Sequence, residues 1–179
     1  MLPQEMIEAL RKRKGLSRDD DTEDRQILKM TPYQIIKECF VYFLGHVIQT
    51  AIIETRQEEV IAIFNVRGTT FEGRKEKLLG LLGKSDTLEC SAYLIPEPNN
   101  PHDSNAIRIH TCKPDIHIGY VPKEICKILL YGFTKRTITE YGHKIVIQRG
   151  TNNEKEEIIW IEFYLQEADD SRKKLERGF

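Results

Sequence analysis

The apolar residues of this chain change their spacing near residue 58, from a helical period of about 3.6 residues to an alternation of two. Before that point, residues 3–14 are predicted to form a short helix. Charges of both signs follow, with RKRK at 11–14 and DDDTED at 19–24. Such a mixture is typical of a solvated linker rather than of a patch that binds phosphate.

A second, stronger helix is predicted over residues 32–48. Thr31 and Gln34 have the spacing of a capping box, and Pro32 suits the first helical position. The apolar residues of this helix form one wide stripe: Ile35, Ile36, Cys39, Phe40, Phe43, Leu44 and Val47. A stripe of this kind has to be covered. We expect the flank of the following domain to cover it, and a protein partner or a second copy of the chain (a homodimer) is the alternative.

From residue 58 onwards the pattern predicts short strands interrupted by helices. Both faces of the first strand are apolar, which is typical of a central strand. The predicted elements are strands at 58–66, 88–94, 106–111 and 116–121, helices at 75–82 and from Pro122 to Gly132, and a hairpin of 134–149 with 156–166. This order predicts a mainly β protein with helices (α+β), a small OB/SH3-like β-barrel of about six strands with an N-terminal helical extension.

The same pattern divides the chain into three regions. Residues 1–57 are predicted to be a helical extension and linker, residues 58–166 the β-barrel domain, and residues 167–179 a charged C-terminal tail. With 179 residues, of which 40% are hydrophobic, the chain is long enough to bury a core without disulfides.

Charge restricts the kind of ligand that this chain can bind. The 27 basic and 28 acidic residues give a formal charge of −1. Non-specific coating of duplex DNA needs a strongly basic face, which this composition does not provide. Any nucleic acid must therefore be bound at a small, shaped site.

Cysteine spacing and the apolar runs favour a cytoplasmic protein. The four cysteines form no CxxC pair, and we therefore expect reduced thiols. The same spacing argues against a zinc site, and no cofactor is expected. The N-terminus has no apolar segment typical of a signal peptide. The most apolar run, residues 39–53, is too short and too polar to span a membrane.

Two motifs that suggest enzymes do not satisfy the requirements of their chemistry. GLLGKS at 80–85 resembles a phosphate-binding loop, but Leu78 stands where the first glycine is required. A metal-dependent hydrolase built on His102, Asp103 and His110 would need further ligands at helical spacing. We therefore expect a protein that is not an enzyme, and this hydrolase is kept as an alternative.

The turn EPNNPHDSNAI, from residue 97 to 107, is dense in residues that limit or cap the backbone. It is interpreted either as a rigid loop that only stabilises itself or as a rigid polar rim. In the second interpretation, the rim presents the ring of His102 and the carboxylate of Asp103 to a ligand.

Three motifs in the same order resemble the HIRAN domain. They are FNVRGTTFEGR at 64–74, LIPEPNNPHDSNAIRI at 94–109 and IGYVPKEI at 118–125, and the resemblance covers residues 58–132. That domain precedes the motor in some DNA-remodelling and fork-reversal ATPases and also occurs as a small stand-alone bacterial protein. The resemblance implies a modified OB-like barrel that captures the 3′ end of single-stranded DNA.

Three of the implied site residues would contact the terminal nucleotide. The resemblance implies that Phe71 stacks on the terminal base and that His102 takes the place of a second aromatic, usually tyrosine. Asp103 would accept a hydrogen bond from the 3′ hydroxyl. These roles agree with general chemistry, because a carboxylate accepts from a hydroxyl and repels a phosphate.

Three further residues complete the implied site. Asn100 would help to shape the pocket, Tyr120 would line it, and Lys123 would meet phosphate. For two of the aromatic residues a structural role is the alternative, with Phe71 in the core and Tyr120 closing the barrel.

The chain departs from the family pattern at two positions. Thr70 stands where the family often has arginine, which removes a contact to phosphate or base. Arg67, Arg74 and Lys75 could compensate, although each is expected to be an ordinary surface residue. His102 offers a smaller stacking face than tyrosine and can become charged near pH 6.5.

The resulting prediction is a module that binds single-stranded DNA with a free 3′-OH. It would recruit or position another enzyme in DNA repair, recombination or phage-related DNA metabolism. The first alternative is a protein-interaction barrel that does not bind DNA, and the second is the metal-dependent hydrolase.

Overall fold

A computed structural model describes residues 4–14, 27, 29–47 and 60–166. The helices are α1 (Gln4–Lys14), α3 (Pro32–Val47), α4 (Arg74–Leu82) and α5 (Lys123–Thr134). The strands are β1 (Val60–Asn65), β2 (Thr87–Pro96), β3 (Ile107–Thr111), β4 (His117–Tyr120), β5 (His143–Thr151) and β6 (Glu157–Gln166). The predicted boundary at residue 57 and the predicted tail at 167–179 lie outside the described residues.

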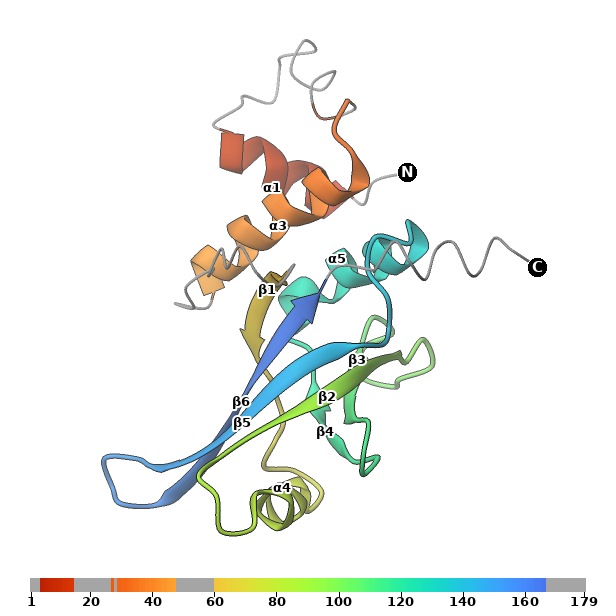
Figure 1. Cartoon of the computed structure of the whole chain (residues 1–179). Coiled ribbons are helices and arrows are strands. Elements are labelled where there is room, and N and C mark those ends of the chain that lie inside the picture. Colours follow the sequence, from red (N-terminus) through yellow and green to blue (C-terminus); the bar gives the residue numbers. More distant parts are fainter. Residues whose placement is uncertain (1–3, 15–26, 28, 48–59, 167–179) are drawn as a thin grey trace, which may run out of the picture.

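The six strands form one antiparallel sheet in the order β1-β6-β5-β2-β3-β4. The sheet curls into a half-barrel (Figure 1), which confirms the predicted fold class. Its two ends meet just beyond β1, where Arg67 N donates to Tyr120 O at 2.9 Å and Tyr120 N donates to Arg67 O at 2.8 Å.

The expectation that the first strand is central is wrong, because β1 is at one end of the strand order. Ala62 and Phe64 are buried in the main core, and Ile63, on the alternate face, is only 5% exposed. Helix α3 packs against β1. Burial of both faces is therefore found in a strand at the end of the strand order, and it does not require a neighbouring strand on each side.

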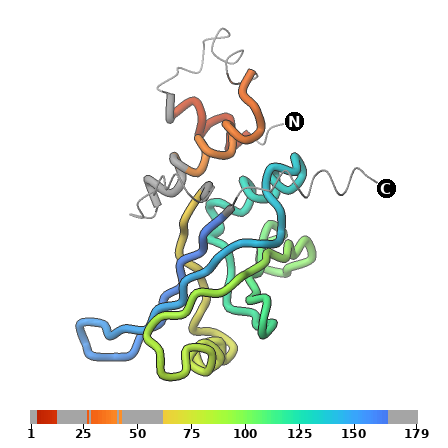
Figure 2. Tube along the Cα trace, viewed as in Figure 1, coloured from red at the N-terminus to blue at the C-terminus, as the bar shows by residue number. Residues whose placement is uncertain are grey.

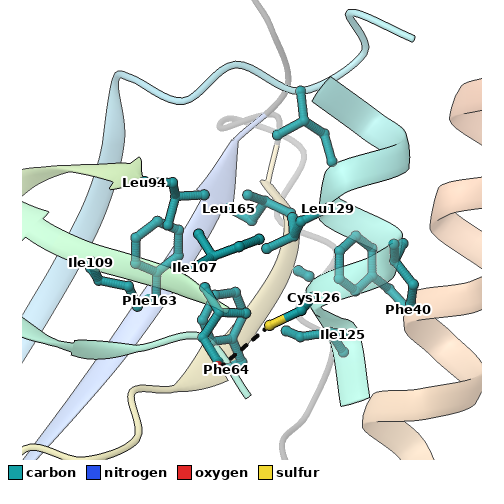
Figure 3. Packing of buried hydrophobic residues seen from close by; sticks show 14 of the residues in the cluster. Phe40, Phe64, Leu94, Ile107, Ile109, Ile125, Cys126, Leu129, Phe163 and Leu165 are labelled. Atoms are coloured by element: carbon teal, nitrogen blue, oxygen red, sulfur yellow. Dashed lines mark hydrogen bonds between the residues drawn. The ribbon is translucent and has the colours of Figure 1, made fainter. Parts of the chain in front are cut away.

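Helix α5 lies between the sheet and α3 (Figure 3). Its buried residues Ile125, Cys126 and Leu129 face a sheet core in which Phe64 and Phe163 stack with ring centres 4.9 Å apart. The helix continues to Thr134, so the predicted stop at Gly132 is wrong. Gly132 is instead a buried helical position where a Cβ would lie 2.6 Å from Ile138 Cδ1.

The helical extension shares its core with the barrel. The predicted capping box of α3 is present, with Thr31 N donating to Gln34 Oε1 at 2.9 Å and Gln34 N donating to Thr31 Oγ1 at 3.2 Å. The buried residues Met6, Leu10, Ile35, Ile36, Cys39 and Phe40 belong to one cluster with residues of the sheet and α5. The described part of the stripe is therefore covered within the chain, while the side chains of Phe43, Leu44 and Val47 lie outside the description.

The hairpin of β5 and β6 projects from the end of the sheet that lies away from α1 and α3 (Figure 2). Its turn is held by Asn152, whose Oδ1 accepts from the backbone N–H groups of Glu154 and Glu156, each at 2.9 Å. This confirms the predicted hairpin around GTNNEK, although β5 begins at His143 rather than at residue 134. None of the helices in the described part of the chain is long and apolar enough to cross a membrane.

Protein stability should fall as the pH drops from about 6.5 to about 4, because His143 is buried as a neutral ring. Its Nε2–H donates to Thr139 O at 2.7 Å, and burial lowers its pKa from 6.5 to about 4. The unfolded chain binds the proton first, so the stabilisation is complete above pH 6.5 and is lost towards pH 4. The difference is on the order of 3 kcal/mol.

Urea denaturation between pH 4 and pH 7.5 measures this effect. The variant His143→Gln should show a smaller pH slope, whatever its stability at neutral pH. The control is the variant His102→Gln, which removes an exposed histidine instead of a buried one. Equal slopes in all three proteins would contradict the assignment to His143.

Candidate nucleic-acid interface

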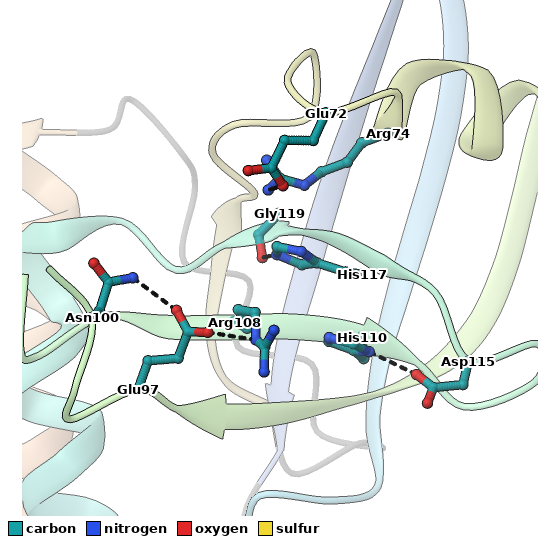
Figure 4. Close-up of polar contacts among 9 residues, drawn as sticks. All are labelled: Glu72, Arg74, Glu97, Asn100, Arg108, His110, Asp115, His117 and Gly119. Atoms are coloured by element: carbon teal, nitrogen blue, oxygen red, sulfur yellow. Dashed lines mark hydrogen bonds and ion pairs between the residues drawn. The ribbon is translucent and has the colours of Figure 1, made fainter. Parts of the chain in front are cut away.

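Three segments meet around the end of β4 that leads into α5 (Figure 4). They are the loop 67–73 after β1, the turn 97–106 between β2 and β3, and the start of α5. Strand β4 pairs with β3 on one side and bridges to Arg67 on the other. Residues that are far apart in the sequence are therefore gathered around Tyr120.

Arg74 orders the loop after β1. Its guanidinium donates to Gly68 O at 2.7 Å and forms an ion pair with Glu72, while only 4% of the side chain is exposed. The same group lies 5.4 Å from the centre of the Tyr120 ring, within range of a cation–π interaction. The expectation that Arg74 is an ordinary surface residue is therefore wrong, because three partners hold this charge in a buried position.

Phe71 lies beside Tyr120 and is open to solvent. At 67% exposure, it is the most exposed of the large hydrophobic side chains in the described residues. A Cβ on Gly68 would lie 3.9 Å from Cδ2 of both Phe71 and Tyr120, so the two rings flank the same glycine. The alternative that Phe71 belongs to the core is therefore wrong.

Tyr120 has two structural roles. Its backbone closes the sheet against Arg67, and its half-buried ring lies between the loop 67–73 and the turn 97–106. Burial raises the pKa of the phenol, and the charge of Glu97 together with a hydrogen bond to Glu97 raises it further. The phenol therefore stays neutral and is held towards the turn.

Glu97 connects Tyr120 to the rest of the turn. Its Oε1 lies 2.7 Å from Arg108 Nε in an ion pair, and its Oε2 accepts from Asn100 Nδ2 at 2.8 Å. Glu97 and Arg108 were not predicted as site residues. The contacts of Glu97 with Arg108 and with Tyr120 arise only through the pairing of β2 with β3 and of β3 with β4. The sequence signal for these two residues was limited to a glutamate at the start of a turn rich in proline, asparagine and aspartate.

The turn 97–106 is rigid because its side chains cap its own backbone. Asn100 Oδ1 accepts from His102 N at 2.9 Å and from Asp103 N at 3.2 Å. Asp103 Oδ1 accepts from Asn105 N at 2.9 Å and from Asn105 Nδ2 at 3.3 Å. Among the contacts of the described residues, Asp103 Oδ2 has no partner, so one oxygen of this half-buried carboxylate is uncommitted. The ring of His102 is exposed.

The first turn of α5 adjoins Asp103. Burial, and in addition the charge of Asp103, raises the pKa of Cys126 to about 12. The carboxylate is thus near enough to this helix for its charge to act on Cys126. Lys123 is exposed at the first position of the helix.

The structure joins some of the predicted residues directly and others only through the turn. Phe71, Tyr120 and Asn100 are connected by shared neighbours, namely Gly68 between the first two and Glu97 between the last two. His102 and Asp103 belong to the same turn, and Lys123 is at the start of α5. The contacts of the described residues do not join Phe71 directly to His102 or Asp103.

The residues of the hydrolase alternative are not brought together. His110 Nδ1 lies 2.7 Å from Asp115 Oδ1, at the end of β3 away from the turn that holds His102 and Asp103. Within the described ranges, no three His, Cys, Asp or Glu side chains are grouped so that they could hold a metal ion.

A curled antiparallel half-barrel with rings and polar groups at the end of one strand is typical of small barrels that bind nucleic acids. The HIRAN domain family model matches residues 61–166, and the chain belongs to this family. HIRAN domains are DNA-binding domains, so nucleic-acid binding is the general class of function of this chain.

One solved structure, the HIRAN domain of human HLTF, is similar to this chain with 20% sequence identity and a TM-score of 0.30. The similarity covers 52% of this chain and 89% of the human domain. No curated protein sequence matches the chain.

Proposed function

We propose that this chain binds the 3′ end of single-stranded DNA at the surface formed by Phe71, Asn100, His102, Asp103, Tyr120 and Lys123. Asp103 carries the proposal. Its Oδ1 is held within the turn, while Oδ2 is uncommitted among the contacts of the described residues. A rigid carboxylate with a free oxygen, next to the exposed ring of His102, suits a ligand that offers both a hydroxyl group and a base.

Selection for a chain end follows from the chemistry of this carboxylate. An ionised oxygen accepts a hydrogen bond from a 3′-OH and repels a 3′-phosphate. A nucleotide within a continuing strand has no free 3′-OH to donate. Asp103 therefore favours a free 3′-OH over a 3′-phosphate and over an internal nucleotide.

The rings supply affinity that does not depend on sequence. Stacking of a base on an aromatic side chain contributes about 1–3 kcal/mol for any base. The exposure of Phe71 and its position beside Tyr120 support this role. Lys123, exposed at the start of α5, supplies one phosphate contact. Because the chain has a formal charge of −1, we expect it to make few phosphate contacts, and its affinity for DNA should depend only weakly on salt concentration.

The chain would serve as a module that recruits or positions a separate enzyme at a DNA end, in repair, recombination or phage-related DNA metabolism. This role depends on end binding, because a module that binds a 3′ end brings the enzyme to the DNA end on which it acts.

Fluorescence anisotropy with the full chain tests the proposal. Three oligothymidylates of equal length are compared at moderate salt, one ending in 3′-OH, one ending in 3′-phosphate and one closed into a circle. We expect the 3′-OH strand to bind about tenfold more tightly than the other two, as one charge-assisted hydrogen bond implies. Equal affinity for all three would contradict end recognition, and negligible binding of all three would favour the protein-interaction barrel.

A further inference from the structure

Five rings form a continuous row that starts at Tyr120 and runs away from the turn 97–106. We call this set, Tyr120, His117, His110, Tyr93 and Tyr141, the ring row. The successive ring centres are 5.0, 5.2, 5.4 and 5.5 Å apart. The rings of His117 and His110 are nearly parallel, at 8°, and those of Tyr93 and Tyr141 lie at 18°.

Strand register explains why these rings share a face. His110 lies opposite Tyr93 of β2 and opposite His117 of β4. The residues on either side of His110, Ile109 and Thr111, are buried, as are Ala92 and Leu94 on β2 and Ile118 on β4. The ring row therefore lies on the face of β2, β3 and β4 that is turned away from the core.

The middle of the row is held in place by hydrogen bonds. Asp115 Oδ1 accepts from Tyr93 OH at 2.8 Å and lies 2.7 Å from His110 Nδ1. His117 Nε2–H donates to Gly119 O at 3.1 Å. Burial, aided by the positive charge of Arg74, lowers the pKa of His117 to about 4, so its ring is uncharged at neutral pH. These rings are thus fixed before any ligand arrives.

The far end of the row is open. Tyr141 is 60% exposed and stacks on Tyr93 with one face, while Thr139 Oγ1 donates to Tyr141 O at 2.6 Å and fixes its backbone. An exposed tyrosine held in this way adds little to the core. It extends the row from β2 to the residues that lead into β5.

We propose that the ring row is a stacking track for the nucleotides that precede the bound 3′ end. This inference rests on the proposed function, because Tyr120 belongs to both the end site and the row, so that a strand leaving the end site meets the row first. A base of any sequence can stack on the face of Tyr141 that is turned away from Tyr93, and the rings behind Tyr141 hold it in place. The carboxylates of Glu97 and Asp115 and the guanidinium groups of Arg74 and Arg108 all lie beside the row. Because charges of both signs are present, stacking of bases rather than net charge provides the affinity.

The test compares strand lengths in the full chain. Oligothymidylates with a 3′-OH, from about 4 to about 16 nucleotides, cover the usual range of OB-type sites. We expect the affinity of the unaltered protein to rise with length. Tyr141→Ala and Tyr141→Leu should weaken binding of the longer strands about tenfold, as expected for one lost stacking contact. Binding of the shortest strand and its preference for 3′-OH over 3′-phosphate should not change.

The variant Tyr141→Phe is the matched control, because it keeps the ring and should bind like the unaltered protein. Tyr141→Leu keeps an apolar side chain without a ring, so unaltered binding by this variant would overturn stacking. Affinity that is independent of length, with the 3′-OH preference intact, would overturn the track and leave the proposed function standing. Failure of every strand to bind would instead overturn the proposed function, and the track with it.

Discussion

Replacing Asp103 by asparagine is expected to abolish the preference for a 3′-OH over a 3′-phosphate. The variant keeps an oxygen at the Oδ1 position, which accepts from Asn105 N at 2.9 Å, so the turn is retained. It replaces the uncommitted oxygen by an uncharged NH₂ group that donates. Because hydrogen bonds to charged groups contribute about 1.5–3 kcal/mol, affinity for the 3′-OH strand should fall by about tenfold or more.

Anisotropy with the 3′-OH and 3′-phosphate strands measures this change. Affinity for the 3′-phosphate strand should stay the same or rise, since the repelling charge is gone. The matched control is Asp86→Asn, which removes the same charge from an exposed residue in the α4–β2 connection. If both variants kept the preference for 3′-OH, Asp103 would have no role in reading the end.

Local features of the fold could be predicted from the sequence. The capping box of Thr31 and Gln34, the hairpin around Asn152 and the alternation in β2 each depend on residues close together in the chain. The central position predicted for β1 was wrong for a related reason. Apolar residues on both faces indicate that both faces are buried, but they do not indicate which element buries them. They therefore do not distinguish a central strand from a strand at the end of the sheet.

The candidate site was predictable only in part. Its turn and exposed ring were visible in the motifs, but the buried position of Arg74 was not, because its partners include Tyr120, which is distant in the sequence. The link from Tyr120 through Glu97 to Arg108 depends on strand register. The apolar alternation excludes a shift of one residue, but which residues of β2, β3 and β4 lie opposite one another is seen only in the folded sheet.

Replacing Gly119 by alanine is expected to lower the free energy of unfolding by about 3 kcal/mol or more. A Cβ at this position would lie 2.4 Å from Arg67 O and 2.6 Å from Val66 Cγ1. The nearer atom belongs to the backbone that closes the sheet, so it cannot move aside without breaking the bridge to Tyr120. The φ angle of 150° at Gly119 adds strain, because side-chain-bearing residues rarely adopt it.

Urea denaturation measures the loss, with Gly80→Ala as the matched control. Gly80 lies on an exposed part of α4, and a Cβ there would meet nothing within 4 Å. This control should be neutral or more stable by about 0.5–1 kcal/mol, as usual for alanine in a helix. Equal stability of the two variants would contradict a close approach at Gly119.

The same substitution should also weaken DNA binding in molecules that remain folded. The bridge between Arg67 and Tyr120 holds the loop that carries Phe71 against the strand that carries Tyr120. When the two separate, the rings no longer flank one surface, although Asp103 and its turn are untouched. Gly119→Ala should therefore lose affinity for all strands while keeping the preference for 3′-OH over 3′-phosphate, the opposite of the result expected for Asp103→Asn. If the folded variant bound with unaltered affinity, closure of the sheet would serve stability alone.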